Sequence, residues 1–292
     1  VGISFLSLKC RKPLSYRDIW GFPKLFLRDQ RVPVMKKQIP CAASTFKTST
    51  PNSLTILTSK AEQILGKVFK KKTSGDVEKS SYANEKYFRA TSVEVGGLVD
   101  LGQVLGELEG KYNTSGIVRG DLTKKALRGE WIRRLSNHQK DGSAPTLKSA
   151  PKRWICLDID DLPFPKDLDP HSPEDRIEAI KRLVEEHLPE EFHMVSFYYQ
   201  WSSSFGVGED GFEKLKLHLW FWSSTPLTDW QLKAWLKNTP VDLALFSAAQ
   251  IHYTAAPVFR GMNDPLGGER SGLVHLEASE IFPPVIAQST PK

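Results

Sequence analysis

Cysteine is scarce in this chain of 292 residues: Cys10, Cys41 and Cys156 are scattered singly along it. Their spacing excludes a CxxC zinc site and argues against a scaffold held by disulfides. A run of 18 or more apolar residues is also missing, so we expect no membrane span and no membrane partner. Residues 1–8 are too short an apolar stretch, broken too early by Lys9, to be a secretory signal. Together these absences predict a protein of the reducing cytoplasm.

Two common phosphate-binding motifs are absent as well. The sequence contains neither GxGxxG nor GxxxxGK[ST], so it supports neither a Rossmann nor a P-loop nucleotide site. What is present is the composition of a globular protein, with 40% apolar and 25% charged residues. The length allows one large domain or two smaller ones.

The net charge of +6 hides an asymmetry along the chain. Residues 1–90 hold 18 Lys and Arg against 6 Asp and Glu, a balance of +12, so residues 91–292 hold 22 against 28, a balance of −6. A basic region before an acidic body suits a phosphate-rich partner such as nucleic acid, although a merely solvated leader has the same composition. We therefore expect a basic, partly disordered region over residues 1–82, with one helix that begins at Ser59 and ends in the basic run at residues 70–72, and a polar linker over residues 72–81.

From about residue 85 the periodicity becomes regular and predicts strands mixed with helices. The expected strands cover residues 88–95, 115–118, 194–201, 215–222 and 274–277, and the expected helices cover residues 99–108 and 124–135 and begin at Ser172 and Thr228. The two kinds of element do not alternate strictly. This order favours an α+β fold with a mostly antiparallel sheet over a doubly wound one.

The most informative stretch, residues 154–161, is an apolar strand that ends in three carboxylates. Because strand side chains alternate with period two, Asp158 and Asp160 project from the same face. Two like charges on one face repel each other unless a cation lies between them, and Mg²⁺ or Mn²⁺ is the usual solution. The alternative is a strand end followed by a solvated acidic turn.

A second polar cluster lies in the apolar strand at residues 215–221. Lys216 and His218 share one face of it, and the opposite face is apolar. A single histidine on a strand is more often structural, but a lysine beside it gives two cationic donors suited to a triphosphate. Ser204, in the serine run at the end of the preceding strand, adds a hydroxyl donor. Asp242 follows the apolar Val241 and, taken alone, reads as a helix cap.

The order of these motifs resembles the archaeo-eukaryotic primase superfamily, in particular the primase-polymerases carried by phages, plasmids and integrative elements. That family has the pattern hhhDhD/E, then sxH, then hD/E. Asp158 and Asp160 match the first element, His218 the second and Asp242 the third. The sequence departs from the pattern at Lys216, where the family has a small residue. It departs again downstream, where Gln250 and His252 stand in place of arginine.

The resemblance covers roughly residues 85–280 and implies a catalytic domain over residues 83–292, with an RRM-like antiparallel sheet joined to an α/β module. It implies template-directed nucleotidyl transfer in the replication of a mobile element, with Asp158, Asp160 and Asp242 as catalytic ligands of two Mg²⁺ or Mn²⁺ ions. His218, Lys216 and Ser204 would bind a nucleoside triphosphate. The implied partners are a single-stranded DNA template and a replicative helicase. From charge alone, Arg119, Arg133 and Arg134 are candidates for binding nucleic acid.

Two other classes of protein remain open. A haloacid-dehalogenase-like phosphatase also carries Asp-x-Asp on an apolar strand, with the first Asp as nucleophile. Here the sequence that follows, Asp161-Leu162-Pro163, fits that family poorly, and the motif lies late in the chain. The other alternative is a replication-initiator domain that binds nucleic acid without catalysis.

Overall fold

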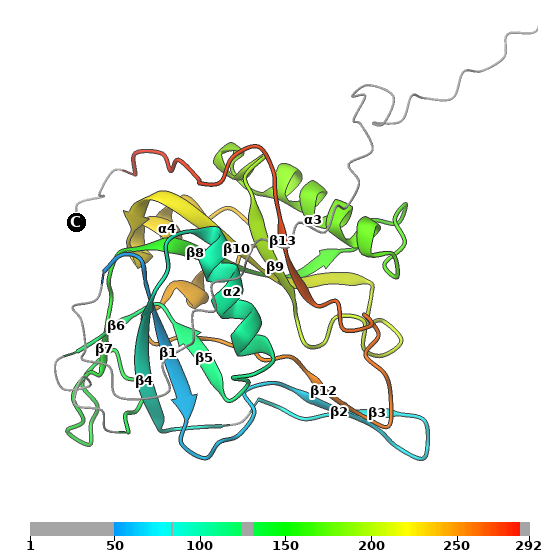
Figure 1. Ribbon diagram of the computed structural model, residues 1–292, viewed down its shortest axis with the longest axis horizontal. Coiled ribbons are helices and arrows are strands. Elements are labelled where there is room, and N and C mark those ends of the chain that lie inside the picture. The colour runs from blue at the N-terminus through cyan, green and yellow to red at the C-terminus, as the bar shows by residue number, and fades with distance from the viewer. Residues whose placement is uncertain (1–49, 83, 124–130, 287–292) are drawn as a thin grey trace, which may run out of the picture. The chain divides into compact units, whose positions relative to one another are not determined.

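The computed structural model describes residues 50–82, 84–123 and 131–286, all within one compact unit that spans residues 39–292. The first part forms β1 (Ser53–Ser59), β2 (Val68–Lys71), β3 (Val77–Lys79), β4 (Phe88–Glu94), α2 (Leu98–Glu109), β5 (Ser115–Val118), β6 (Asp121–Leu122) and β7 (Leu147–Lys148) (Figure 1). The second part forms β8 (Lys152–Pro163), α3 (Pro173–His187), η2 (Glu190–Phe192), β9 (Phe197–Trp201), β10 (Lys214–Leu227), α4 (Asp229–Trp235), η3 (Leu243–Phe246), β11 (Ile251–His252), β12 (Val258–Arg260) and β13 (Ser271–Val274).

The strands form two larger sheets and two smaller ones. The first sheet has the order β11-β5-β1-β4 and the second has the order β13-β9-β10-β8, while β12-β2-β3 and β6-β7 make the smaller sheets. Among the named strand pairs of the described region, β12 and β2 run parallel and the others run antiparallel. The predicted α+β class with mostly antiparallel sheets is confirmed.

Residues 50–82 are part of this fold, which corrects three sequence-based predictions. β1 is a central strand of the first sheet, paired along its whole length with β4 and over four residues with β5. The helix predicted from Ser59 to the basic run at residues 70–72 is wrong, because β1 ends at Ser59 and β2 covers Val68–Lys71. The expected linker over residues 72–81 contains β3, which pairs with β2 as a hairpin. The boundary at residue 82 therefore divides strands that belong to shared sheets.

The second sheet is covered on one face by α3 and α4. The side chains of Ile155, Leu157 and Ile159 on β8 join a hydrophobic cluster with both helices. The helices begin where the sequence predicts. Ser172 caps α3, accepting a hydrogen bond from the backbone N–H of Asp175 at 3.2 Å, and Thr228 and Gln231 form the capping box of α4. Each such cap stabilises a helix by about 1 kcal/mol.

Helix α2 lies between the two four-stranded sheets (Figure 1). Leu101 and Leu105 of α2 are fully buried in a cluster that also contains Trp154 of β8 and Ile56 of β1. Burying a leucine side chain contributes about 1.5–3 kcal/mol, so this cluster joins the sheets firmly. The sheets are thus held together through α2.

Two further expectations concern helices. The helix predicted over residues 124–135 falls largely outside the described residues, and its end is not helical, because Ile132 exchanges backbone hydrogen bonds of 2.8 Å with Phe88. None of the helices in the described part of the chain combines the length and apolarity that a membrane span requires.

Candidate active site

A row of polar side chains crosses the second sheet. Asp158 on β8 lies directly opposite His218 on β10, and His218 lies opposite Gln200 on β9. The distance from Asp158 Oδ1 to His218 Nε2 is 3.4 Å, so the two groups form an ion pair when His218 is protonated. Asp160 and Lys216 project from the same face one step further along, because strand side chains alternate.

A β-bulge interrupts β8 immediately after this row. Two residues of β8, Asp160 and Asp161, stand opposite the single residue Lys216 of β10. Asp161 has a positive φ of 73°, a conformation that Asp tolerates better than most residues. Its carboxylate accepts a hydrogen bond of 2.8 Å from Lys214. The bulge therefore gives the third carboxylate of the motif its own partner and leaves Asp160 with Asp158, as bulges beside functional sites often re-aim one side chain.

Asp242 reaches the same place from a distant part of the sequence. Val241 forms an isolated antiparallel bridge with Ile159, and the N–H of Asp242 donates to the carbonyl of Asp158 at 3.0 Å. The carboxylate of Asp242 also caps η3, accepting a hydrogen bond of 2.8 Å from the N–H of Ala244. The residue is thus both the helix cap and the neighbour of the Asp-x-Asp strand that the sequence suggests.

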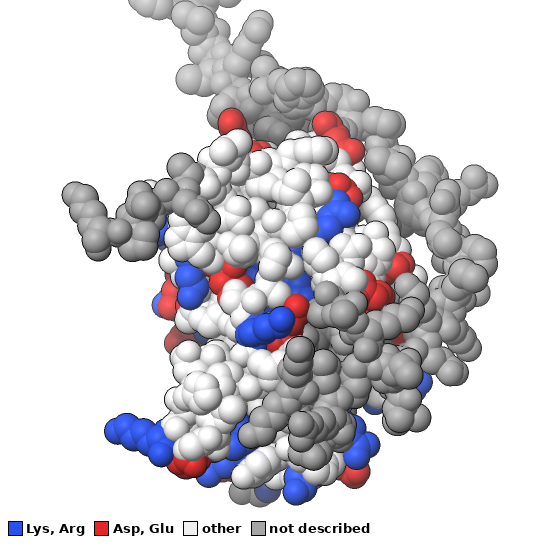
Figure 2. Space-filling view, turned by 90° about the vertical axis from the view of Figure 1, so that its left-hand side faces the viewer, with Lys and Arg blue, Asp and Glu red and all other residues white. Residues whose placement is uncertain are grey.

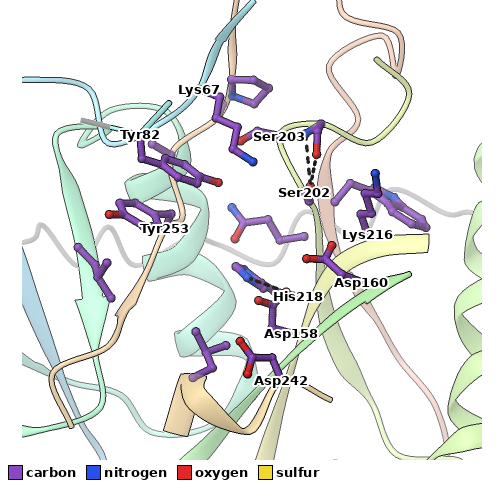
Figure 3. A pocket seen from close by; sticks show the side chains of 18 of the residues that line it. Lys67, Tyr82, Asp158, Asp160, Ser202, Ser203, Lys216, His218, Asp242 and Tyr253 are labelled. Carbon is purple, nitrogen blue, oxygen red and sulfur yellow. Dashed lines mark hydrogen bonds and ion pairs between the residues drawn. The ribbon is translucent and has the colours of Figure 1, made fainter. Parts of the chain in front are cut away.

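All of the side chains predicted to act in catalysis or nucleotide binding line one cavity of about 460 Å³: Asp158, Asp160, Asp242, His218, Lys216 and Ser204 (Figure 3). The second sheet and the turn after β9 form one side of it. Residues of β11 and of the segment that follows it, such as Ile251 and Ala255, form another side. Because β11 pairs with β5 of the first sheet, both large sheets contribute to the cavity.

The electrostatics of the carboxylate pair favour a cation. Partial burial of the carboxyl raises the pKa of Asp160, although much of the residue is exposed, and the charge of Asp158 raises it further. A cation between the two groups would relieve this repulsion, and carboxylate oxygens are the ligands that Mg²⁺ and Mn²⁺ prefer. Within the described residues, no group of three or more His, Cys, Asp or Glu side chains stands ready to hold a metal ion. The chemistry of the donors on β8 fits a hard divalent ion, and Asp158 and Asp160 are the residues that could hold one.

The turn after β9 adds hydroxyl groups to the cavity. The hydroxyls of Ser202 and Ser204 lie 3.1 Å apart, and the Ser204 N–H donates to the Ser202 hydroxyl at 3.3 Å. The hydroxyl of Tyr82 makes a hydrogen bond with Ser203, and burial raises the pKa of this tyrosine. The serine run is therefore a fixed turn that faces the cavity.

Arg119, predicted to bind nucleic acid, is a structural residue instead. Only 1% of it is exposed. Its guanidinium donates to the carbonyls of Trp154 and Leu227 at 2.6 and 2.7 Å and pairs with Asp229 at 3.2 Å. Burial lowers its pKa to about 10, which leaves it charged at neutral pH. The prediction for Arg119 is wrong because charge in the sequence does not tell whether a side chain reaches the surface.

The two other candidate arginines differ from each other. Arg134 is partly buried and donates to the carbonyl of Ala249 at 2.7 Å. Arg133 is half-buried and pairs with the exposed Asp141 at 2.7 Å. Contact of Arg133 with nucleic acid stays a prediction. Figure 2 shows basic and acidic side chains interspersed on one face of the described region, so charge alone does not mark a nucleic-acid path on that face.

Several residues of the cavity escaped the sequence-based analysis: Lys67, Lys79, Tyr82, Gln200 and Tyr253. Gln200 is 5% exposed. Its amide N–H donates to the carbonyl of Thr254 at 2.6 Å, and its Oε1 has no hydrogen-bond partner among the described residues. The alternation of β9 puts Gln200 on the polar face, but no local signal links Lys67 and Lys79 to β8.

Comparisons of this chain with protein-family models, with curated proteins and with solved structures find no match. The function therefore has to be inferred from the geometry and chemistry of the site.

Proposed function

We propose that this chain is a template-directed nucleotidyltransferase of the primase-polymerase type. The observation that carries the proposal is the assembly of Asp158, Asp160, His218 and Asp242 around one cavity, from three separate stretches of the sequence. Register places Asp158 against His218, and a backbone hydrogen bond places Asp242 against Asp158. The three motifs whose order suggested this class therefore meet in space.

The division of labour follows from the side chains. Asp158 and Asp160, with Asp242 beside them, would hold two divalent ions, which when bound activate the attacking 3′-hydroxyl and stabilise the pyrophosphate leaving group. His218, oriented by the Asp158 carboxylate, would donate a hydrogen bond to a phosphate oxygen of the incoming nucleotide. Lys216 and the hydroxyl of Ser204 would add further donors to the same triphosphate.

The layers of the second sheet support the finer part of this proposal. It is a four-stranded antiparallel sheet with α3 and α4 on one face, which is the layer arrangement of an RRM-like unit, while its strand order, β13-β9-β10-β8, places the last strand beside β9 rather than beside β8. The first sheet with α2 would be the attached module, and the cavity lies between the two. Single-stranded DNA would be the template, Arg133 and the basic residues before 90 being candidates for its phosphates. A helicase partner and a role in replicating a mobile element belong to the same proposal.

A primer-extension and de novo synthesis assay on single-stranded DNA, with Mg²⁺ and separately with Mn²⁺, tests the proposal. Incorporation with release of pyrophosphate is expected. Failure to incorporate ribonucleotides or deoxynucleotides with either metal, together with DNA binding that persists in a chelator, would favour a binding-only initiator domain. Release of phosphate from a phosphomonoester would favour a hydrolase in which Asp158 is the nucleophile.

A further inference from the structure

The side of the cavity near the β2–β3 hairpin is lined by lysines. Lys67 immediately precedes β2 and Lys79 ends β3, and both line the cavity with Lys216 of β10. Figure 3 shows the ammonium of Lys67 directed into the space between the tyrosine pair and the serine turn. The acidic pair Asp158 and Asp160 lines another part of the same cavity. One cavity therefore holds a cluster of positive charges and a cluster of negative charges.

The hairpin that supplies two of these lysines is firmly anchored. β2 pairs with β12 in parallel, and the N–H of Val258 donates to the carbonyl of Lys67 at 2.9 Å. A Cβ at Gly66 would lie 2.7 Å from the carbonyl oxygen of Ala256, so the backbones touch there and only glycine fits. The backbone of Lys67 is thus fixed relative to the cavity.

An aromatic pair supports the Lys67 side chain. The rings of Tyr82 and Tyr253 are stacked with centroids 3.9 Å apart and planes 5° apart. The Lys67 Nζ lies 4.7 Å from the centroid of the Tyr82 ring, within the range of a cation–π interaction. The stack therefore holds the ammonium over the cavity rather than letting it extend into solvent.

The three lysines are not explained by pairing with acidic side chains. No ion pair with a carboxylate is formed by Lys67, Lys79 or Lys216 among the described residues. Burial lowers the pKa of Lys67, and the charges of Lys79 and Lys216 lower it further, while Asp160 raises it. Gathering like charges in a partly desolvated space costs free energy unless an anion joins them. The opposite cluster of carboxylates calls for a cation by the same reasoning.

A ligand that satisfies both clusters carries several negative charges and a divalent cation. We propose that Lys67 and Lys79, together with Lys216, bind the polyphosphate tail of a nucleotide, whose metal-bound end faces Asp158 and Asp160. The inference rests on the proposed function and extends it, because it assigns part of the nucleotide site to the β2–β3 hairpin. Tyr82 is a positioning residue for Lys67.

The test measures binding of inorganic tripolyphosphate to the full chain by calorimetry, in a chelator and with Mn²⁺, and compares it with binding of a single-stranded oligonucleotide. Lys67→Met removes the charge and keeps the length of the side chain. Lys67→Arg restores the charge. Lys70→Met is the matched control, because Lys70 lies exposed on the same hairpin and does not line the cavity.

Lys67→Met and Lys79→Met should each weaken tripolyphosphate binding by about 10- to 100-fold, the range for losing a charge-assisted hydrogen bond. Lys67→Arg should recover most of that loss, and Lys70→Met should stay within about twofold. Tyr82→Ala should weaken binding of tripolyphosphate in the parent protein. In a protein that already carries Lys67→Met, adding Tyr82→Ala should weaken binding no further, because Tyr82 acts through Lys67. Thermal unfolding checks each variant. If Lys67→Met is unfolded, the test relies on Lys79→Met, because Lys79 is exposed and its substitution should leave the fold intact.

Equal effects of Lys67→Met and Lys70→Met would overturn the inference, because they would show long-range attraction rather than a site. Loss of oligonucleotide affinity with unchanged tripolyphosphate affinity would also overturn it and would assign the lysines to a nucleic-acid backbone. If the parent protein incorporates nucleotides and Lys67→Met leaves the nucleotide KM unchanged, this inference fails alone. If the parent protein does not incorporate nucleotides but binds tripolyphosphate through these lysines, the proposed function fails and the polyphosphate site stands.

Discussion

Asp158 and His218 face each other on neighbouring antiparallel strands, and 3.4 Å separates Asp158 Oδ1 from His218 Nε2. Their relation is fixed by strand register, since a slip of one residue would turn either side chain to the apolar face. A carboxylate beside an imidazole fixes the orientation of the ring. Removing Asp158 would therefore disturb both a proposed metal ligand and the proposed phosphate donor His218, so Asp160 offers the cleaner test of metal binding.

Asp160→Asn should abolish nucleotide incorporation and leave the fold intact. Because the change removes one of two repelling carboxylates, the melting temperature in a chelator should stay the same or rise slightly. Mn²⁺ should raise the melting temperature of the parent protein, and this rise should disappear in the variant. Thermal unfolding with and without Mn²⁺, together with an incorporation assay, measures both effects.

Asp161→Asn is the matched control for that experiment. It removes the same charge from the next residue, which is paired with Lys214. Incorporation should remain close to that of the parent protein. Full activity of Asp160→Asn, or equal loss in the two variants, would contradict the distinction that the β-bulge makes between these carboxylates.

The buried Arg119 predicts a stability effect rather than a binding effect. Arg119→Met leaves Asp229 and the carbonyl of Trp154 without their partner, and breaking such a buried pair costs about 3–5 kcal/mol. Urea unfolding should therefore show a large fall in the free energy of unfolding, whereas Arg133→Met, which breaks a pair with the exposed Asp141, should change it by less than about 1 kcal/mol. A stable Arg119→Met protein with weakened DNA affinity would refute this assignment.

The elements that sequence could predict are those set by local patterns. The starts of α3 and α4 follow from their caps at Ser172 and Thr228, which act within three residues. The shared face of Asp158 and Asp160 follows from the period of a strand, and so does that of Lys216 and His218. Local chemistry was sufficient for these features.

The features that escaped prediction depend on distant partners. The apolar spacing at Ile64, Leu65 and Val68 suits a helix, but β1 and β2 are held by pairing with β4, β5 and β12. The contact of β2 with β12 joins residues about 190 positions apart, such as Val68 and Val258. The bulge at Asp161 likewise depends on the register of β10, which no local pattern records.

The pairing of β1 predicts where the chain can be shortened. Deleting residues 1–38 leaves the compact unit of residues 39–292 whole, so the remaining chain should fold with little change in melting temperature. Deleting residues 1–59 removes β1, whose backbone pairs on both sides and whose Ser53 hydroxyl accepts a hydrogen bond from the buried Lys152 at 2.7 Å. That shorter chain should not fold. Circular dichroism and thermal unfolding distinguish the two outcomes.

The same deletion of residues 1–38 tests the role of the basic region. This segment holds 9 Lys and Arg against 2 Asp. Its loss should weaken binding to single-stranded DNA and flatten the salt dependence by about 0.7 per lost phosphate contact. Incorporation at saturating template should change little. Loss of incorporation under those conditions would mean that the segment belongs to the catalytic unit.

His252 predicts a pH dependence of stability. It is 1% exposed and lies between the rings of Trp154 and Trp220, each with its centroid 5.5 Å away. Burial holds the pKa of His252 well below its ordinary value, and the charges of His218 and Arg119 lower it further. In the unfolded chain the pKa of a histidine is about 6.5. Between that pH and the lower pKa of the folded state, the unfolded chain binds one more proton than the folded protein.

The free energy of unfolding should therefore fall as the pH drops below about 6.5, with a contribution from His252 of about 1.4 kcal/mol per pH unit. His252→Leu removes this contribution and keeps an apolar side chain between the tryptophans. Urea unfolding of both proteins from pH 8 to pH 5 isolates the effect, because the contributions of the other titrating groups largely cancel in the difference. Plotted against pH, the free energies of unfolding of the two proteins should run parallel above pH 7.5. Below pH 6.5 their slopes should differ by about 1.4 kcal/mol per pH unit, which corresponds to one proton. Curves that stay parallel down to pH 5 would mean that His252 takes up its proton without unfolding and that its site admits a charge.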